Sequence, residues 1–242
     1  MLSFAQNPIY SLPSDRKEST ALRYQCLVLD HDDTVTDSTA HVHYPAFQDA
    51  MRQMRPGVSL SLEDYLRVNF DPGFHAYCAQ TLRFTEADFE REYGIWQGWV
   101  QKTVPQVFPG MVRLIRRFTE AGGLVCVVSH SVDFNIRRDY RENGLPEPYL
   151  VYGWEQPKEH RKPEPWPLDQ IMEKTGLPAS QLLMVDDLKP GLDMAQKRGV
   201  DFAAALWAYD VPEIHGFMRR HSPLCFDTPE ALEAFVMEDQ QS

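Results

Sequence analysis

Cysteines are scarce in this chain of 242 residues, and their spacing indicates little chemistry. The four are Cys26, Cys78, Cys126 and Cys225, and no two of them form a Cys-x-x-Cys pair. Cys26 and Cys126 lie inside apolar runs. We therefore expect buried free thiols, as in proteins of a reducing cytosol.

Long apolar runs and an excess of basic residues are also missing. No run approaches the roughly 20 residues of a membrane span, and the N-terminal region has no basic start followed by an apolar core. Acidic residues outnumber basic ones 35 to 24, which gives a net charge of −11. This balance argues against a general nucleic-acid or anionic membrane surface, although a local basic pocket is compatible with it. We expect a cytoplasmic protein with no membrane or nucleic-acid partner.

Short apolar runs alternate with helical patterns along most of the chain. Most of the runs lack an in–out alternation, so both faces of each predicted strand are buried, as in a parallel sheet covered by helices. The runs lie at 26–29, 124–128, 149–152, 182–185 and 202–207. The order strand, helix, strand, helix predicts an open α/β fold, with a Rossmann-like parallel sheet and helices on both faces.

The helical patterns have recognisable ends. Met111, Leu114, Ile115 and Phe118 share one helix face, and this helix stops before the glycines at 122–123. A similar pattern occupies 168–175. Near the C-terminal end, Thr228 is a candidate N-cap with Pro229 at the first helical position.

Residues 39–106 interrupt this alternation. The segment is rich in aromatic residues, has no strong strand run and carries helical patterns, such as Phe89, Tyr93 and Trp96 on one face. We interpret it as a helical insertion after the first strand. The predicted organisation is a lead-in at 1–20, a catalytic core made of 21–38 and 107–242, and the insertion at 39–106.

Polar side chains follow the predicted strands at the points where the strands end. Asp30 and Asp32 follow the first strand, Ser129 the second, and Asp186 with Asp187 the fourth. Ligands of open α/β sheets bind beyond these carboxyl ends. Carboxylates from two strand ends suit Mg²⁺, one aspartate could attack a phosphate, and a second could act as acid and base. Lys162, between the third and fourth strands, adds a positive charge for phosphate oxygens.

Together these motifs resemble the haloacid dehalogenase-like hydrolase superfamily, in its phosphatase and β-phosphoglucomutase-like branch with a helical C1-type cap. The Asp-x-Asp-x-Thr motif is Asp30, Asp32 and Thr34. The second motif is Ser129 in "VCVVSHS", and the third is Lys162 in "KPEP". The stretch "LLMVDDLKPGLDMAQKRGV", residues 182–200, resembles the fourth, and the "FPGMVRLIRRFTEAGG" stretch before the second motif is also similar.

The resemblance implies a role for each of these residues. Asp30 is the nucleophile and a Mg²⁺ ligand, and Asp32 is the acid/base whose main-chain carbonyl also binds the metal. Thr34 supports the turn. Ser129 and Lys162 hold the phosphate, together with the backbone of Asp32 and Asp33. Asp187 binds Mg²⁺, Asp186 is a direct or water-mediated ligand, and 39–106 corresponds to the cap.

Five further residues lie within or close to these motifs. His41, His43 and His130 are candidates for the substrate pocket, because they follow the first two motifs. His31 and Asp33 depart from the family, which usually has a bulky apolar residue and often glycine at these positions. We predict that the Asp33 carboxylate does not touch the metal.

Several other readings compete with this one. A calcium-binding loop is excluded, because Val35 occupies the position that needs glycine and His41 the position that needs glutamate. Asp32 argues against dehalogenation, since dehalogenases lack that carboxylate. The leading hypothesis is a Mg²⁺-dependent phosphatase of a small phosphorylated metabolite that works through an aspartyl phosphate. A sugar phosphomutase and a catalytically inactive binding protein remain alternatives, and the substrate and oligomeric state stay open.

Overall fold

The structure, a computed structural model, describes residues 22–237. The predicted lead-in at 1–20 lies outside this range. Six strands form one sheet in the order β3-β2-β1-β4-β5-β6, and every neighbouring pair is parallel. The strands are β1 (Cys26–Leu29), β2 (Leu124–Val128), β3 (Leu150–Tyr152), β4 (Leu182–Asp186), β5 (Asp201–Ala205) and β6 (Leu224–Phe226). The predicted fold class is therefore confirmed.

All five apolar runs form strands, and the two central ones, β1 and β4, are buried along their whole length. Neither face of these strands meets water, which explains why their sequences show no alternation. The edge strand β6 was not predicted, because it has three half-buried residues and no distinct apolar pattern. Cys26 and Cys126 are buried free thiols, as expected.

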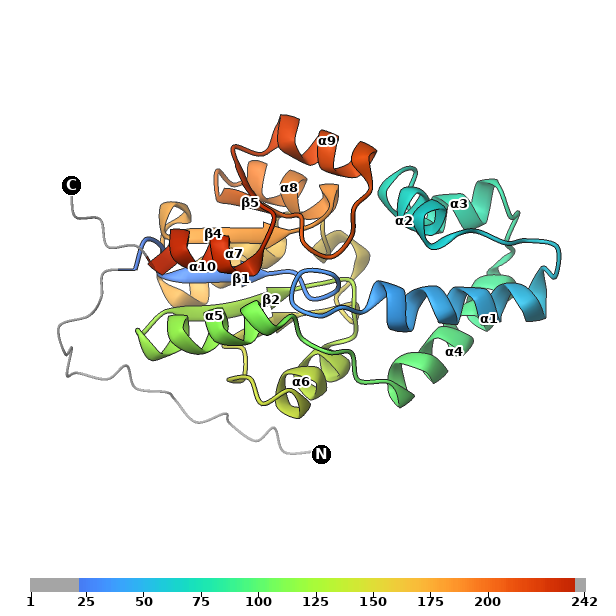
Figure 1. Cartoon of the computed structure of the whole chain (residues 1–242), viewed down its shortest axis with the longest axis horizontal. Helices are drawn as coiled ribbons and strands as arrows, with labels where there is room; N and C mark the ends of the chain where they lie inside the picture. Colours follow the sequence, from blue (N-terminus) through green and yellow to red (C-terminus); the bar gives the residue numbers. More distant parts are fainter. Residues whose placement is uncertain (1–21, 238–242) are drawn as a thin grey trace.

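Helices cover both faces of the sheet (Figure 1). One face carries α5 (Pro109–Glu120), α6 (Asp133–Glu142) and α10 (Pro229–Met237), and the other carries α7 (Trp166–Thr175), α8 (Lys189–Gln196) and α9 (Pro212–His221). Short 3₁₀ turns, η2 (Lys158–His160) and η3 (Ala179–Gln181), precede α7 and β4. The predicted N-cap of α10 is confirmed, since the Ala231 N–H donates to Thr228 Oγ1 at 3.2 Å.

The range 39–106, hereafter the insertion, is helical throughout its regular parts. It contains the π-helical turn η1 (Thr39–His43) and the helices α1 (Tyr44–Met54), α2 (Leu62–Phe70), α3 (Phe74–Gln80) and α4 (Glu86–Lys102). These helices surround an apolar cluster of their own, centred on Phe47, Met51 and Cys78. The exact limits of the core and cap domains stay a prediction.

The two links between the sheet and the insertion run side by side. Thr36 pairs with Val107 in an antiparallel bridge, and the Asp37 N–H donates to the Gln106 carbonyl at 2.9 Å. The insertion thus leaves and re-enters the core at one place, next to the carboxyl end of β1 (Figure 1). Such a paired link suits a hinge between two bodies.

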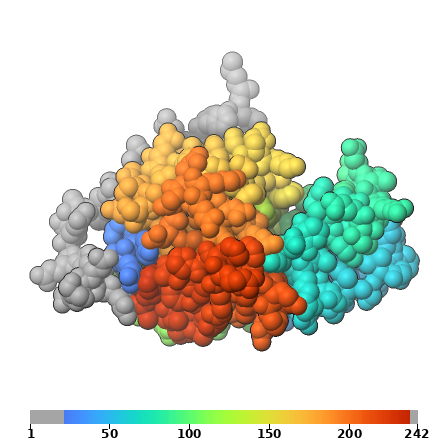
Figure 2. All heavy atoms as spheres, turned by 90° about the horizontal axis from the view of Figure 1, so that it is seen from above, coloured from blue at the N-terminus to red at the C-terminus, as the bar shows by residue number. Residues whose placement is uncertain are grey.

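The insertion also contacts the core away from these links. Phe70 of α2 packs edge-on against Phe217 of α9, with ring centroids 5.3 Å apart, and the Lys189 Nζ lies 4.0 Å from the Phe70 ring centroid. Figure 2 shows the cyan lobe of the insertion against the orange and red atoms of the C-terminal third. The insertion therefore closes over the strand ends instead of projecting freely.

None of the helices within residues 22–237 has the length and apolar character needed to cross a membrane. The predicted cytoplasmic location stays a prediction.

Candidate active site

Three carboxylates meet at the carboxyl ends of β1 and β4. Asp30, Asp186 and Asp187 each offer an oxygen atom, and these atoms lie within 4.8 Å of one another. The two strands are neighbours with Leu29 opposite Val185, so the residues that follow them emerge at the same level of the sheet. All three carboxylates are buried. The predicted convergence of the two acidic motifs is thus present in the structure.

Lys162 lies between two members of this cluster. Its Nζ is 2.6 Å from Asp30 Oδ1 and 2.6 Å from Asp186 Oδ2. Burial by itself disfavours the ammonium, but the two carboxylates outweigh that cost and raise the pKa of Lys162 above its usual range. The lysine is therefore held charged next to Asp30.

Asp186 is fully engaged by protein groups. One oxygen accepts from Lys162, and Oδ1 accepts from the Leu188 N–H at 2.8 Å. Gly191 makes room for this side chain, because a Cβ there would lie 2.3 Å from Asp186 Oδ2. Burial, reinforced by the charge of Asp30, raises the pKa of Asp186 to about 6.

Asp187 has one oxygen engaged and one not. Tyr209, in the loop after β5, donates its hydroxyl to Asp187 Oδ2 at 2.8 Å. Oδ1 is buried without a hydrogen-bond partner among the described residues. Burial and the neighbouring carboxylates raise the pKa of Asp187 well above its ordinary value. A buried oxygen without a partner, in a set of oxygen donors with excess negative charge, fits a hard cation such as Mg²⁺.

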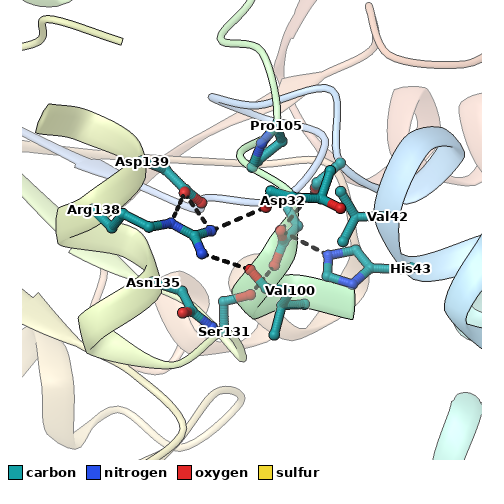
Figure 3. Close-up of a pocket in the computed structure, with 11 residues that line it drawn as sticks. Asp32, Val42, His43, Val100, Pro105, Ser131, Asn135, Arg138 and Asp139 are labelled. Atoms are coloured by element: carbon teal, nitrogen blue, oxygen red, sulfur yellow. Dashed lines mark hydrogen bonds and ion pairs between the residues drawn. The ribbon is translucent and has the colours of Figure 1, made fainter. Parts of the chain in front are cut away.

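The Asp32 carboxylate has three donors of its own. It accepts from Ser38 Oγ at 2.7 Å, His43 Nε2 at 2.9 Å and Ser131 Oγ at 2.5 Å. In Figure 3, His43 and Ser131 point toward it from different elements. Burial opposes ionisation, but the hydrogen bonds from His43 and Ser131 outweigh it and lower the pKa of Asp32 below its ordinary value. Asp32 is therefore held as a carboxylate.

The carboxylate of Asp32 lines a small side pocket, drawn in Figure 3. The walls come from η1, the end of α4, the link back to the core and the start of α6. Asp30, Lys162 and Asp187 are not among the residues that line it. The acid/base candidate thus occupies a compartment next to the carboxylate cluster.

Ser129 and Thr34 are buried beside these groups. Ser129 Oγ accepts from the Ser131 N–H at 3.0 Å. The Thr34 carbonyl accepts from the Trp207 indole at 3.1 Å, while Thr34 Oγ1 has no partner among residues 22–237. Thr34 therefore supports the turn after β1 through its main-chain carbonyl and not through its hydroxyl.

Asp33 directs its side chain along the turn. Its φ of +58° is a left-handed conformation, which aspartate tolerates better than most residues. Asp33 Oδ1 accepts from the Thr39 N–H at 2.9 Å, and burial raises its pKa to about 6. Its own N–H donates to the Thr36 carbonyl at 2.7 Å, so this amide, a predicted phosphate donor, has a protein acceptor here.

His31 replaces an apolar side chain and is almost fully buried. Its Nε2 lies 3.1 Å from Asp139 Oδ2 on α6. Asp139 in turn pairs with Arg138 at 2.6 Å, and Arg138 Nη1 donates to the Val100 carbonyl at 2.6 Å. A polar relay therefore runs from the nucleophile loop to the end of α4.

Two of the three candidate pocket histidines, His41 and His130, take part neither in the relay from His31 nor in the bonds to Asp32. His41 is exposed and its Nε2 lies 3.2 Å from Asp37 Oδ2. His130 is also exposed, with Nε2 2.9 Å from the Lys162 carbonyl. Of the three, only His43 bonds to the side chain of a catalytic candidate, whereas His130 contacts the main chain of Lys162. The pocket roles of all three stay predictions.

Sequence reasoning missed several residues of this site. Tyr209 lies in the loop after β5, four residues beyond the end of the strand, so a search of the loops that follow the strands would have found it. Ser131 lies two residues after Ser129, and the second motif assigns a role only to Ser129. Ser38, Trp96, Arg138 and Asp139 carry no local signal that links them to the site.

Comparisons with known proteins agree with this geometry. The sequence model of the family described as haloacid dehalogenase-like hydrolase matches residues 27–205. Among curated proteins, a phosphoglycolate phosphatase from Mesorhizobium japonicum is 23% identical over 145 residues, which span 59% of this chain and 64% of that protein.

Two solved structures are similar across most of their length. A haloacid dehalogenase-like hydrolase from Streptococcus pneumoniae superposes with a TM-score of 0.71 at 14% identity, over 88% of this chain and 98% of that one. CbbY from Rhodobacter sphaeroides, in complex with xylulose-1,5-bisphosphate, superposes with a TM-score of 0.66 at 16% identity. The match covers 86% of this chain and 96% of that one. At these identities the structures share the fold. Because the family match extends from β1 through β5, the chain belongs to the haloacid dehalogenase-like hydrolase family.

Proposed function

We propose that the protein is a Mg²⁺-dependent phosphohydrolase that acts on a small phosphorylated metabolite through an aspartyl phosphate. The observation that carries this proposal is the position of Lys162, which bonds Asp30 beside an Asp187 oxygen that has no hydrogen-bond partner within residues 22–237. The family supports a hydrolase, and the curated relative is named as a phosphatase.

In the first half of the reaction, Asp30 attacks the phosphorus atom. A bond forms between an Asp30 oxygen and phosphorus as the ester P–O bond breaks, and the leaving alcohol takes a proton from Asp32 in its acid form. Lys162 offsets the charge of Asp30 and, with Ser129, holds the phosphate oxygens.

In the second half, Asp32 accepts a proton from water while the water oxygen attacks phosphorus. Phosphate leaves and Asp30 is restored. The three donors around Asp32 favour its carboxylate form, which is the form that this step requires. To donate a proton to the leaving group, Asp32 must be protonated. The protonated carboxyl must also break at least one of its hydrogen bonds to Ser38, His43 and Ser131.

Asp30, Asp187 and the main-chain carbonyl of Asp32 would hold the Mg²⁺ ion. When bound, the ion supplies positive charge that attracts the phosphate and offsets the repulsion among the acids. Asp186 has both oxygens engaged by Lys162 and Leu188, so we assign it to the outer sphere, where it meets the ion through water.

The test compares wild type with Asp30→Asn on a panel of phosphate esters, with Mg²⁺ and with chelator. We expect phosphate release by wild type with Mg²⁺ only, and a loss of about a thousand-fold or more in the variant. Equal turnover by both proteins would contradict the proposal. Isomerisation of a sugar phosphate without phosphate release would favour a phosphomutase instead.

A further inference from the structure

A chain of hydrogen bonds connects helix α4 to the acid/base candidate. The Trp96 Nε1 atom lies 2.9 Å from His43 Nδ1, and His43 Nε2 lies 2.9 Å from Asp32 Oδ1. The imidazole and indole rings are nearly parallel, at 18°, with centroids 6.1 Å apart. Trp96 and His43 both belong to the insertion, whereas Asp32 follows β1 in the core.

The direction of these bonds is fixed by chemistry. An indole N–H can only donate, so His43 Nδ1 must be the acceptor. An imidazolium would carry a proton on Nδ1 as well and would set that N–H against the indole N–H, so the bond from Trp96 requires the neutral imidazole, whose proton is on Nε2. That N–H points at Asp32, which is an acceptor in its carboxylate form. The order of donors therefore runs from Trp96 through His43 to Asp32.

We propose that Trp96 is a positioning residue that acts through His43 on the catalytic carboxylate of Asp32. By fixing the Nε2–H form of His43, Trp96 supplies Asp32 with one of its three donors and so holds its orientation. The role of Asp32 as the acid/base rests on the proposed function. The inference moves His43 from the substrate pocket, where the sequence places it, to the support of Asp32.

The other form of His43 would have the opposite effect. With the proton on Nδ1, a lone pair on Nε2 would face the Asp32 carboxylate, and two acceptors would repel each other. His43 is largely buried, with 14% of its side chain exposed, so water has little room to replace the lost donor. Ser38 and Ser131 would then hold Asp32 alone.

This support also depends on the place of the insertion. Both Ser131 and Asp32 belong to the core, whereas η1 and α4 bring the imidazole and the indole from the insertion. The third donor on Asp32 is therefore delivered by the insertion when it lies against the core.

Trp99 offers a matched control on the same helix. Its indole donates to Asp49 Oδ2 at 3.2 Å, and both residues lie within the insertion. Trp99→Phe thus removes the same kind of donor from α4 and leaves the bonds from Trp96 to His43 and from His43 to Asp32 in place. Trp96→Phe removes the donor to His43.

The first experiment reads the imidazole directly. We expect the ¹⁵N NMR spectrum of histidine-labelled wild-type protein, without substrate, to show His43 protonated at Nε2 and not at Nδ1. Trp96→Phe should shift His43 toward a mixture of the two forms, whereas Trp99→Phe should leave it unchanged. A wild-type His43 protonated at Nδ1 would overturn the proposal, and this measurement needs no variant.

The second experiment uses turnover of the best ester of the panel. Trp96→Phe should lower kcat by about 3- to 10-fold, the rate equivalent of one hydrogen bond, with little change in KM. Trp99→Phe should keep wild-type values. His43→Gln keeps an amide donor that needs no tryptophan, so adding Trp96→Phe to it should cost nothing further.

An equal loss from Trp96→Phe in the wild-type and His43→Gln backgrounds would show that Trp96 does not act through His43, and would overturn the proposal. A change in KM alone would do the same. If wild type turns over no ester, the proposed function fails, while the NMR spectrum still decides the form of His43.

Discussion

Lys162 and Asp186 form a buried ion pair of 2.6 Å between Nζ and Oδ2, as short as the pair between Lys162 and Asp30. One ammonium thus pairs with two carboxylates, and beside them lies the Asp187 oxygen that has no partner in the described part of the chain. The site has more negative charge than the protein itself compensates. This imbalance explains why a cation and an anionic substrate could bind together.

Loss of Lys162 should damage both stability and turnover. Lys162→Met leaves two buried carboxylates, Asp30 and Asp186, without their cation, so we expect the free energy of unfolding to fall by about 3–5 kcal/mol in chelator. Phosphate release should fall by a hundred-fold or more, on the order of a lost charged contact in the transition state.

Urea unfolding and phosphate release check this prediction. Lys197→Met serves as the control, because Lys197 is an exposed lysine paired with Glu164 and its loss should cost less than about 1 kcal/mol. Equal losses for the two variants would contradict a special role for Lys162.

Tyr209 should set the affinity for Mg²⁺. Its hydroxyl holds one oxygen of Asp187 and leaves the other for the ion. Tyr209→Phe should therefore weaken Mg²⁺ binding by about ten-fold, as for other outer-shell partners of a metal ligand. Isothermal titration calorimetry measures this directly, and Tyr149→Phe, at an exposed tyrosine, should bind Mg²⁺ like wild type.

Glu92 should make stability depend on pH. This half-buried carboxyl on α4 has its pKa raised by burial from 4.5 to about 7. Between these values the folded state binds more protons than the unfolded chain, so stability falls as pH rises from about 4.5 through 7. At about 1.4 kcal/mol per pKa unit, the free energy of unfolding falls by about 3 kcal/mol across this range.

Glu92→Gln should remove this part of the pH dependence and stabilise the protein at pH 8. Glu90→Gln is the matched control, since Glu90 is exposed on the same helix. Urea unfolding at several pH values, in chelator, compares the three proteins. A curve for Glu92→Gln that parallels wild type would show that Glu92 is not responsible.

Arg138 should anchor the end of α4 to the core. Its Nη1 donates to the Val100 carbonyl and its Nη2 to the Thr103 carbonyl at 3.1 Å, while Asp139 fixes the guanidinium. We expect Arg138→Met to cost about 3 kcal/mol, because it leaves Asp139 with its charge only partly compensated.

Hydrogen exchange in residues 101–107 should also become faster in Arg138→Met, as the hinge side of α4 loses its anchor. Arg141→Met on the same helix removes an exposed arginine that pairs with Glu142 and should change neither quantity. Unaltered exchange in Arg138→Met would contradict the anchoring role.

The fold and the central site could be predicted because local signals determine them. The runs at 26–29 and 182–185 are apolar enough to be buried on both faces, and parallel pairing brings the residues that follow them to one edge. Asp30, Asp186 and Asp187 meet for that reason, and Lys162 reaches them from the loop between β3 and α7. The edge strand β6 was not predicted, because its three half-buried residues are too few to form a distinct apolar pattern.

The surroundings of Asp32 and His31 were decided by tertiary structure. Ser131 lies 99 residues from Asp32, and Asp139 lies 108 residues from His31. Such bonds depend on how α4 and α6 pack against the turn after β1 and on where each side chain points. The sequence by itself therefore determined which residues end the strands, since apolar burial and parallel pairing follow from the local pattern. Only the tertiary structure decided which donors surround Asp32, because hydrogen bonds require a direction and distance that no local pattern contains.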